Sequence, residues 1–390
     1  MKFQYICTDC GKNYDITPKA MVCPTCYSNQ DPLKPLKGIL EVELTGQCSK
    51  NFNVFDLLPV KEKYFPKIPV GNTPLWKPER LNNEIGFKNL YIKNDATNPT
   101  GSLKDRASFL VAAFAKEHGI RDIVLASTGN AGSSMAGIGA AAGLNVLLFL
   151  PKDAPPAKLI QALQYGADVR RVNGNYDLAY ELSMQYVAEK GGLSRNTAYN
   201  PLTIEGKKTV ALEMFQQLGE PPDYVFVPTG DGVIVSGVFK GFKDLLKLGI
   251  ITKFPIIVTV QAEGSSAIAR SITLGDFELP VPSRTIADSI SVEVPKNGYY
   301  ALKQIKAFNG MCSVVTDQSI LDAQLVLSKW AGVFVEPAAA TAYAGFCQLK
   351  NKLPRDAKAV VLLTGHGLKD ITSAAKRIKV PEKLYEKYKQ

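Results

Sequence analysis

The segments DIVLAS (residues 122–127), NVLLFLP (145–151) and AVVLLTG (359–365) decide the fold. Each is a short apolar run that ends at Gly, Ser or Pro, and DYVFVPTG (223–230) and IIVTVQAEG (256–264) follow the same pattern. Amphipathic stretches follow these runs. Continuous apolar strands that alternate with helices are typical of buried, mostly parallel sheets. The sequence therefore predicts an α/β protein with open parallel sheets.

The composition is that of an ordinary globular chain, with 46% hydrophobic and 21% charged residues among 390. The 46 lysines and arginines outnumber the 36 acidic residues, and the net charge of +10 favours anionic ligands. The basic residues are scattered, except at 376–389, where glutamates interrupt them and a solvated helix is expected instead of a nucleic-acid surface. No membrane-length apolar run or secretory signal is present, which predicts a cytoplasmic protein without a membrane partner.

Cys7 and Cys10 form one CxxC motif near the N-terminus, and Cys23 and Cys26 form a second. Each motif can present two thiolates from a tight turn, and together they supply the four ligands of a structural zinc site. A disulfide-linked module and a redox-active CxxC are the alternatives. The first 30 or so residues are too few for an apolar core, so a metal would supply the folding free energy of this segment.

Three loops after predicted strands carry polar residues, and the first of them is STGNAGSS (127–134). Ligands of open α/β sheets bind beyond the carboxyl ends of the strands, where this loop is expected. Ser127, Thr128 and Asn130 stand at the start of a predicted helix, and such a helix N-terminus can bind an anion. The alternative is that these residues only cap the helix and permit tight packing.

The second loop, within PTGDGVIVSG (228–237), places Gly230, Asp231 and Gly232 between a strand and a helix predicted over 233–247. Glycines let backbone N–H groups approach a phosphate closely, and the helix dipole adds positive potential. A dinucleotide fingerprint would require a third glycine at position 235, where the chain has Val. The loop therefore predicts a phosphate site for a mononucleotide or a cofactor.

The third loop, LTGHGLKD (363–370), closes the last strand with Thr364 and His366. A reactive base is expected at Lys104, in NPTGSLKDRAS (98–108), because this lysine lies in the first turn of a predicted helix that Ser102 can cap. The positive end of the helix dipole lowers the pKa of a lysine, and a lysine with a depressed pKa can act as a nucleophile. A solvated surface lysine is the alternative.

These motifs, together with EPAAATAYAG (336–345), follow the order and approximate separations found in the fold-type II pyridoxal-phosphate enzymes, which the chain resembles over about residues 60–375. The match is closest to the threonine synthase family, which also carries a CxxC ribbon. The resemblance implies the tryptophan synthase β-like fold, with two open parallel-sheet α/β domains. We expect a zinc ribbon at 1–35, a large cofactor-binding domain at 46–99 plus 211–375, a small mobile domain at 100–210, a tail at 376–390, and a homodimer.

The resemblance also implies roles for individual residues in binding pyridoxal 5'-phosphate. Lys104 would hold the cofactor covalently, Asn130 would hydrogen-bond its 3-hydroxyl, and Thr364 would face its pyridine nitrogen. The cofactor phosphate would be held by the loop that contains Gly230, Asp231, Gly232, Val233 and Ile234. The implied reaction on a small amino-acid substrate is elimination of phosphate from O-phosphohomoserine, followed by hydration to threonine.

The residues that would contact the substrate depart from the family pattern. Ser127 and Thr128 would bind the substrate carboxylate, but Thr203 stands where threonine synthases usually carry an arginine that helps to hold the substrate phosphate. Losing a guanidinium weakens phosphate binding, unless Lys207 or Lys208 compensates. Two alternatives stay open: a lyase or β-replacement enzyme on another amino acid (serine or threonine dehydratase, cysteate synthase-like, or thiolase-type), and a non-catalytic binding module.

Overall fold

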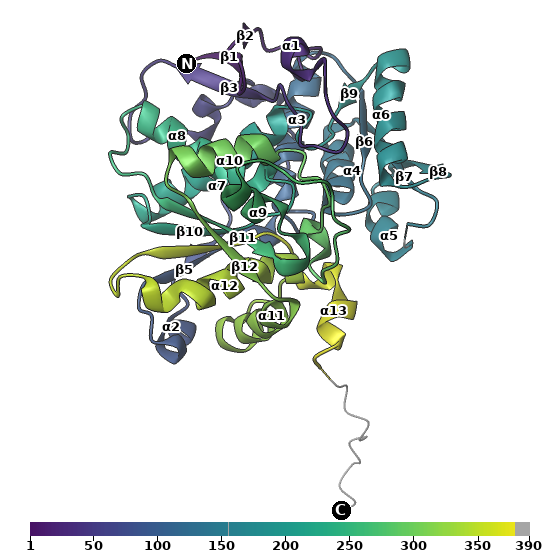
Figure 1. Ribbon diagram of the computed structural model, residues 1–390. Helices are drawn as coiled ribbons and strands as arrows, with labels where there is room; N and C mark the ends of the chain where they lie inside the picture. The colour runs from purple at the N-terminus through teal and green to yellow at the C-terminus, as the bar shows by residue number, and fades with distance from the viewer. Residues whose placement is uncertain (155, 379–390) are drawn as a thin grey trace, which may run out of the picture.

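The computed structural model describes residues 1–154 and 156–378, which form three β-sheets and the helices that cover them (Figure 1). The predicted sequence of strands and helices is confirmed, and so is the α/β fold class. Most of the expected terminal helix at 376–389, and of the tail at 376–390, lies outside the described residues. No helix within the described residues is both long and apolar enough to cross a membrane.

An antiparallel three-stranded sheet forms the N-terminal part of the molecule. Its strands are ordered β2-β1-β3, and a short helix, α1, precedes β3 in the chain. The elements are β1 (Lys2–Cys7), β2 (Asn13–Tyr14), α1 (Pro24–Tyr27) and β3 (Leu40–Thr45). The sequence places the end of the ribbon at residue 35, but the sheet includes β3, which lies beyond that residue. Leu40 and Val42 of β3 are buried in the same core as Leu110 and Val111 of α3, which ties the N-terminal sheet to the rest of the protein.

The second sheet is four-stranded and parallel, with the order β8-β7-β6-β9. Ile123 and Leu125 of β6 pack on one face with α3 and α4, whereas Val124 and Ala126 pack on the other face with α6. Both faces are thus covered, as the apolar runs predict. The elements are α3 (Lys104–Glu117), β6 (Asp122–Ala126), α4 (Asn130–Ala142), β7 (Asn145–Pro151), α5 (Pro156–Gln164), β8 (Asp168–Val172), α6 (Tyr176–Lys190) and β9 (Leu193–Ser194).

The third sheet is six-stranded, with the order β12-β11-β10-β13-β5-β4, and only its edge strand β4 is antiparallel. Helices cover both of its faces. The strands are β4 (Leu75–Trp76), β5 (Leu90–Asn94), β10 (Tyr224–Pro228), β11 (Ile256–Ala262), β12 (Met311–Val315) and β13 (Ala359–Leu363). The remaining helices are α2 (Glu79–Ile85), α7 (Leu202–Leu218), α8 (Val233–Lys247), α9 (Ala267–Leu274), α10 (Gly298–Ala307), α11 (Asp317–Ala331), α12 (Pro337–Leu349) and α13 (Ile371–Ala375).

Helix α7 connects the two parallel sheets, because it packs against both α3 and α8. A Cβ at Gly206 would lie 2.4 Å from the carbonyl oxygen of Arg106, so α7 approaches the backbone of α3 closely. A Cβ at Gly237 would lie 2.7 Å from the Cβ of Lys207, so α8 approaches α7 just as closely. The domain boundary placed between 210 and 211 therefore falls inside a continuous buried helix.

Candidate active site

The loop before α3 and the loop after β13 are joined by backbone hydrogen bonds. Leu103 donates its N–H to the carbonyl oxygen of Thr364 at 2.9 Å, and His366 donates to Gly101 at 3.0 Å. Ser102 and Gly365 form an antiparallel bridge between the same two segments. Two motifs separated by most of the chain are thereby brought together, and α3 begins at the carboxyl end of β13.

Lys104 is the first residue of α3 and is partly exposed to solvent. Desolvation lowers its pKa, the charges of Asp231 and Glu336 raise it, and the charge of Arg195 lowers it further. Within the described residues, its Nζ makes no hydrogen bond or ion pair. The expected lowering of the pKa is present, although burial and not the helix dipole is the main cause. An unengaged amine with a depressed pKa has the chemistry of a nucleophile and base.

Asn130 is the first residue of α4 and is held by residues from distant parts of the chain. Its Nδ2 lies 3.0 Å from each carboxylate oxygen of Glu336 and 3.1 Å from the hydroxyl of Ser289. These contacts use the amide N–H groups, so the carbonyl oxygen of Asn130 stays free to accept a hydrogen bond from a ligand hydroxyl.

Glu336 is a site residue to which the sequence analysis gives no role, although it opens the quoted motif EPAAATAYAG. It is buried at the start of α12, and its N–H donates to the carbonyl oxygen of Gly365 at 3.0 Å. Burial raises the pKa of its carboxyl group, while hydrogen bonding to Asn130 and the charge of Lys104 lower it. An acidic residue before a proline and a run of alanines is the signal that could have identified it.

Ser127 and Thr128 lie at the end of β6, next to Asn130, as the sequence predicts. The hydroxyl of Ser127 accepts hydrogen bonds from the N–H groups of Gly132 at 3.0 Å and Gly129 at 3.3 Å. Ser127 therefore accepts hydrogen bonds from N–H groups at the start of α4, as the capping alternative requires. A role for Ser127 and Thr128 in binding a substrate carboxylate stays a prediction.

The loop between β10 and α8 has the properties of a phosphate site. A Cβ at Gly230 would lie 2.8 Å from the backbone of Ile290, and Gly232 has φ of +89°, so both positions favour glycine. Among the described residues, no acceptor receives the N–H groups of Gly230, Asp231 and Gly232. The next N–H, that of Val233, donates to the Asp231 carboxylate at 2.9 Å. Free N–H groups at a helix N-terminus fit the phosphate of a cofactor.

Two further residues of this region complete the set expected around a cofactor. The side chain of Ile234 is buried, so this residue can offer a ligand only its backbone. Thr364 is buried, and its hydroxyl makes no hydrogen bond within the described part of the chain. Together with Lys104, Asn130 and the glycine loop, this neutral hydroxyl fits pyridoxal phosphate, which needs an amine, an anion cradle and a few polar contacts.

The two residues expected beside the substrate differ in what they can offer. Thr203 is fully buried, and its hydroxyl donates to the carbonyl oxygen of Asn200 at 2.8 Å. Lys207, one turn further along α7, is also fully buried, but its Nζ has no hydrogen-bond partner among the described residues. Lys208 differs from Lys207, because its amine already forms ion pairs with Glu205 and Asp244.

The four cysteines of the CxxC motifs converge. All four Sγ atoms lie within 4.8 Å of one another, and Cys7 to Cys26 and Cys10 to Cys23 are each separated by 3.8 Å. Zinc bonded tetrahedrally to sulfur at about 2.3 Å places the sulfurs about 3.8 Å apart, so the cluster fits a zinc ribbon. No disulfide links these cysteines, which disfavours the disulfide alternative.

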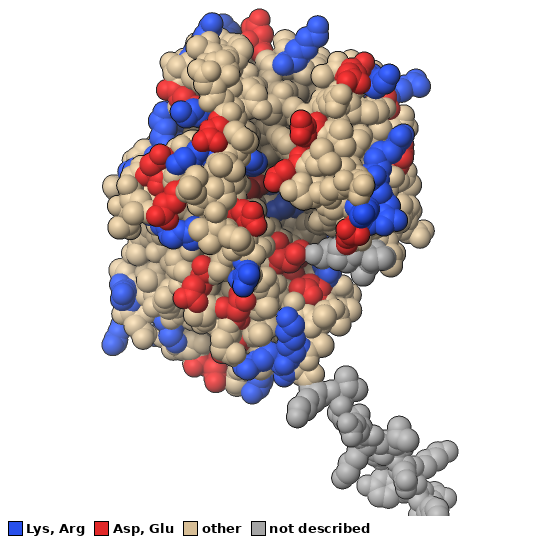
Figure 2. All heavy atoms as spheres, turned by 45° about the vertical axis from the view of Figure 1, so that its right-hand side comes forward, with Lys and Arg blue, Asp and Glu red and all other residues tan. Residues whose placement is uncertain are grey.

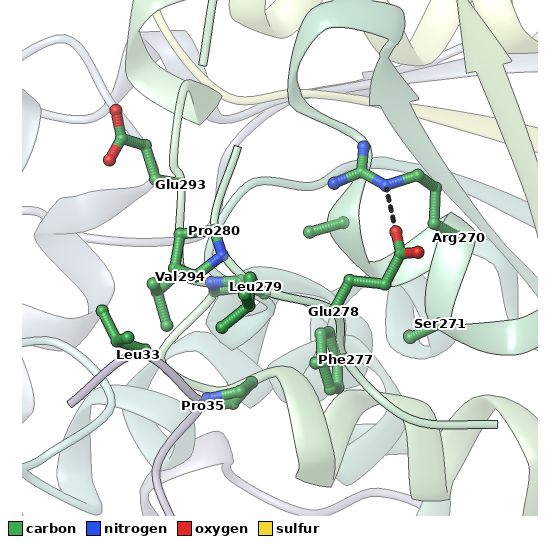
Figure 3. Close-up of a pocket in the computed structure, with 12 residues that line it drawn as sticks. Leu33, Pro35, Arg270, Ser271, Phe277, Glu278, Leu279, Pro280, Glu293 and Val294 are labelled. Carbon is green, nitrogen blue, oxygen red and sulfur yellow. Dashed lines mark ion pairs between the residues drawn. The ribbon is translucent and has the colours of Figure 1, made fainter. Parts of the chain in front are cut away.

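The surface of the molecule is hollowed between two lobes. Figure 2 shows blue atoms of lysine or arginine in the depth of this hollow and red atoms of acidic residues along its rim. A separate cavity lies where the segment at 33–35 meets the segments at 277–280 and 293–295, and an ion pair of 3.6 Å joins Arg270 to Glu278 there (Figure 3). With a volume of about 10 Å³ it holds at most about one water molecule, so it is not a substrate site.

The chain belongs to the family of pyridoxal-phosphate dependent enzymes, which it matches over residues 67–365. A threonine synthase of Methanocaldococcus jannaschii is 35% identical over 390 residues, which cover 97% of this chain and 96% of the relative. A threonine synthase of Halalkalibacterium halodurans is 37% identical over 331 residues, covering 83% and 90%. The protein is thus a pyridoxal-phosphate-dependent lyase that is similar to threonine synthases.

Solved structures show the same fold at lower sequence identity. Maize serine racemase has a TM-score of 0.67 and 23% identity, with 76% of this chain and 88% of that chain covered. A threonine deaminase of T.th. has a TM-score of 0.65 and 25% identity, with 76% and 92% covered.

Proposed function

We propose that this chain is a threonine synthase, which eliminates inorganic phosphate from O-phosphohomoserine and adds water at the β carbon to give threonine. The observation that carries the proposal is the extent of the likeness: the match to the Methanocaldococcus jannaschii enzyme covers 97% of the chain and so includes most of the cysteine-containing N-terminal sheet. The serine racemase and threonine deaminase structures cover less of the chain, between 76% and 85%.

Pyridoxal phosphate, when bound, supplies an electron sink for negative charge that develops at the α carbon of an amino acid. Lys104 is the base that the site offers, because its lowered pKa increases the fraction of neutral amine that can accept a proton. Glu336 fixes the amide of Asn130, whose free carbonyl oxygen would accept a hydrogen bond from a hydroxyl group of the cofactor. Thr364 would offer a neutral hydroxyl to the pyridine nitrogen of the cofactor.

A lyase that acts on an unphosphorylated amino acid is the second candidate, and one observation favours it. Thr203 replaces the arginine that threonine synthases usually carry, and its hydroxyl is used within its own turn at Asn200. If no other cation held the substrate phosphate, the affinity for O-phosphohomoserine would be low.

Isotope labelling tests the proposed reaction directly. In water enriched with oxygen-18, a threonine synthase releases unlabelled phosphate, because the carbon–oxygen bond breaks, and the label enters the hydroxyl of threonine. A phosphatase would place the label in the phosphate, and a dehydratase would yield ammonia and a 2-oxo acid. The first pattern supports the proposal, and either of the others contradicts it.

The zinc site is a separate part of the proposal. The mutual distances of the four thiols support a structural zinc ion bound by Cys7, Cys10, Cys23 and Cys26. All four ligand positions would then be filled by protein, which leaves none open for chemistry at the metal. Unlinked thiols persist in reducing compartments, so we include a cytoplasmic location in the proposal.

A further inference from the structure

Two buried cations close to Lys104 differ from the other buried cations of the described chain. Arg195 and Lys207 have no exposed surface, and no carboxylate oxygen within the described residues lies within ion-pair distance of either. The other buried lysines and arginines are all paired with carboxylates. The pairs are Lys93 with Glu213 at 2.7 Å, Arg106 with Glu213 at 2.6 Å, Lys208 with Asp244 at 2.8 Å and Lys240 with Asp244 at 2.5 Å.

Both unpaired cations also have unused hydrogen-bond donors. The Nη2 of Arg195 and the Nζ of Lys207 are buried without a partner among the described residues. A buried charged donor without a partner is costly to a folded protein, and native structures usually satisfy such groups. An anion that enters from solvent could offer acceptor oxygens to such donors.

Arg195 is placed beside the candidate active site by the four-stranded sheet. It follows β9, and its N–H donates to the carbonyl oxygen of Val124 at 2.8 Å, which extends the pairing of β9 with β6. Its Nε lies 3.3 Å from the hydroxyl of Ser108, one helical turn after Lys104 on α3. The Nη1 donates to Thr197 at 2.8 Å, so two of the three guanidinium nitrogens fix the group and the third is free.

Lys207 is placed by α7, the helix that packs against both α3 and α8. Its stem lies against Gly237 of α8, where no side chain would fit. Long side chains on a helix point back toward its N-terminus, so the side chain of Lys207 lies over the surface next to Thr203, four positions earlier. A lysine at 207 can therefore place its charge close to where an arginine at 203 would have placed one.

The electrostatic environment joins these two cations to Lys104. Burial lowers the pKa of Lys207 well below its usual value, the charge of Asp231 opposes this shift, and the charges of Lys104 and Arg195 add to it. Burial likewise lowers the pKa of Arg195 to about 10, against the charge of Asp231. Three basic groups thus lie close enough to influence one another, and within the described residues neither Arg195 nor Lys207 forms an ion pair with the acidic groups nearby.

We propose that Arg195 and Lys207 together bind the phosphate group of the substrate and replace the arginine that is missing at position 203. The inference rests on the proposed threonine synthase function. The cofactor also carries a phosphate, but the free N–H groups of Gly230, Asp231 and Gly232 already provide for it. Arg195 instead follows β9, which pairs with β6. Strand β6 leads to Ser127 and Thr128, the residues expected at the substrate carboxylate.

The test uses holoenzyme in which one cation is made neutral at a time, in the variants Lys207→Met and Arg195→Gln. Inorganic phosphate should raise the thermal unfolding midpoint of the wild-type holoenzyme, because a bound ligand stabilises the folded state. Either variant should lose this rise, and its KM for O-phosphohomoserine should increase about tenfold to a hundredfold, as expected for one charge-assisted hydrogen bond. Lys207→Arg should keep much of the affinity.

Two controls separate binding from a structural role. Lys306→Met neutralises an exposed lysine on α10 and should change neither the phosphate response nor the KM. Without phosphate, Lys207→Met should unfold at the same or a higher temperature than wild type, because an unpaired buried amine is removed. A lower midpoint together with an unchanged KM would mean that Lys207 is a packing residue, which overturns the proposal.

The remaining outcomes distinguish the sources of the phosphate. If the variants weaken binding of pyridoxal phosphate but keep the response of the holoenzyme to inorganic phosphate, the cations serve the cofactor and the proposal is wrong. If both variants release phosphate with an unchanged KM, threonine synthase activity stands but this subsite does not. If wild type releases no phosphate, yet inorganic phosphate binds and the variants abolish that binding, the anion subsite stands and the proposed activity falls.

Discussion

The backbone N–H of Leu103 donates to the carbonyl oxygen of Thr364 at 2.9 Å, and this bond joins the residue before Lys104 to the last strand of the six-stranded sheet. Lys104 and Thr364 are separated by more than half of the chain, yet they are fixed relative to each other by main-chain contacts. A base and a neutral hydroxyl that are set on rigid elements keep their separation when ligands bind.

Replacing Lys104 with alanine should abolish the covalent attachment of the cofactor. We expect the visible absorption of the purified holoenzyme to be lost, borohydride to leave no lysine-linked pyridoxyl group, and phosphate release to fall about 10²- to 10⁴-fold, as for the loss of a general base. Lys116→Ala, at an exposed position of the same helix, should keep the spectrum. A visible spectrum that Lys104→Ala leaves unchanged would refute the assignment.

Replacing Glu336 with glutamine should shift the reactivity of Lys104 to lower pH. The negative charge of Glu336 raises the pKa of Lys104, so its removal lowers that pKa and increases the neutral fraction of the amine at a given pH. The rate at which apoprotein acquires visible absorption after pyridoxal phosphate is added, followed over about pH 6 to 10, should reach its midpoint at a lower pH. Glu79→Gln, on the exposed side of α2, should leave the midpoint in place, whereas a shift to higher pH in Glu336→Gln would contradict this reading.

The cysteine cluster should contain one zinc ion per chain. Cys23→Ser should lose the metal and lower the thermal unfolding midpoint by several degrees, because metal binding contributes folding free energy to this segment. The cofactor spectrum should stay largely intact, since the cluster belongs to the N-terminal sheet and not to the loops around Lys104. Cys347→Ser, at an exposed single cysteine, is the matched control. Wild-type protein that contains no zinc would contradict the proposal.

The buried carboxylate of Glu213 should stabilise the fold at neutral pH. Burial alone would raise its pKa, but Arg106 and Lys93 outweigh this effect and lower it to about 2. The stabilisation is therefore complete above the pKa of an unfolded glutamate, about 4.3, and is lost as the pH falls toward 2.

Glu213→Gln should cost about 3–5 kcal/mol at neutral pH, because it leaves a buried guanidinium without its full partner. Urea unfolding at several pH values measures the difference from wild type, which should shrink as the pH falls. Glu181→Gln, exposed on α6, should have little effect. A difference that is independent of pH would show that the charge of Glu213 does not matter.

The sequence predicts the regular parts of this protein well, because they depend on local patterns. The helix expected over 233–247 has these bounds in the structure, and Lys104 lies in the first turn of α3 as expected. Glu336 could not be assigned from local patterns, since its partner Asn130 lies 206 residues away in the chain. Arg195 could not be assigned for a related reason. Its importance follows from being buried without a carboxylate partner among the described residues, and only the folded structure shows which residues surround it.

The boundary expected at 210/211 shows a different limit. Helix α7 continues through this position and packs against both α3 and α8, and such contacts between distant segments cannot be read from composition. The capping role of Ser127 was an open alternative from the sequence, and the hydrogen bonds from Gly129 and Gly132 favour it.

The most direct test of the proposed function is steady-state release of inorganic phosphate from O-phosphohomoserine by wild-type holoenzyme, with threonine measured in the same samples. We predict equal amounts of phosphate and threonine, and a kcat/KM far above that for deamination of L-serine or L-threonine. Absence of phosphate release, together with ammonia and a 2-oxo acid formed from an unphosphorylated amino acid, would contradict the proposal and make the protein a different lyase of the same family.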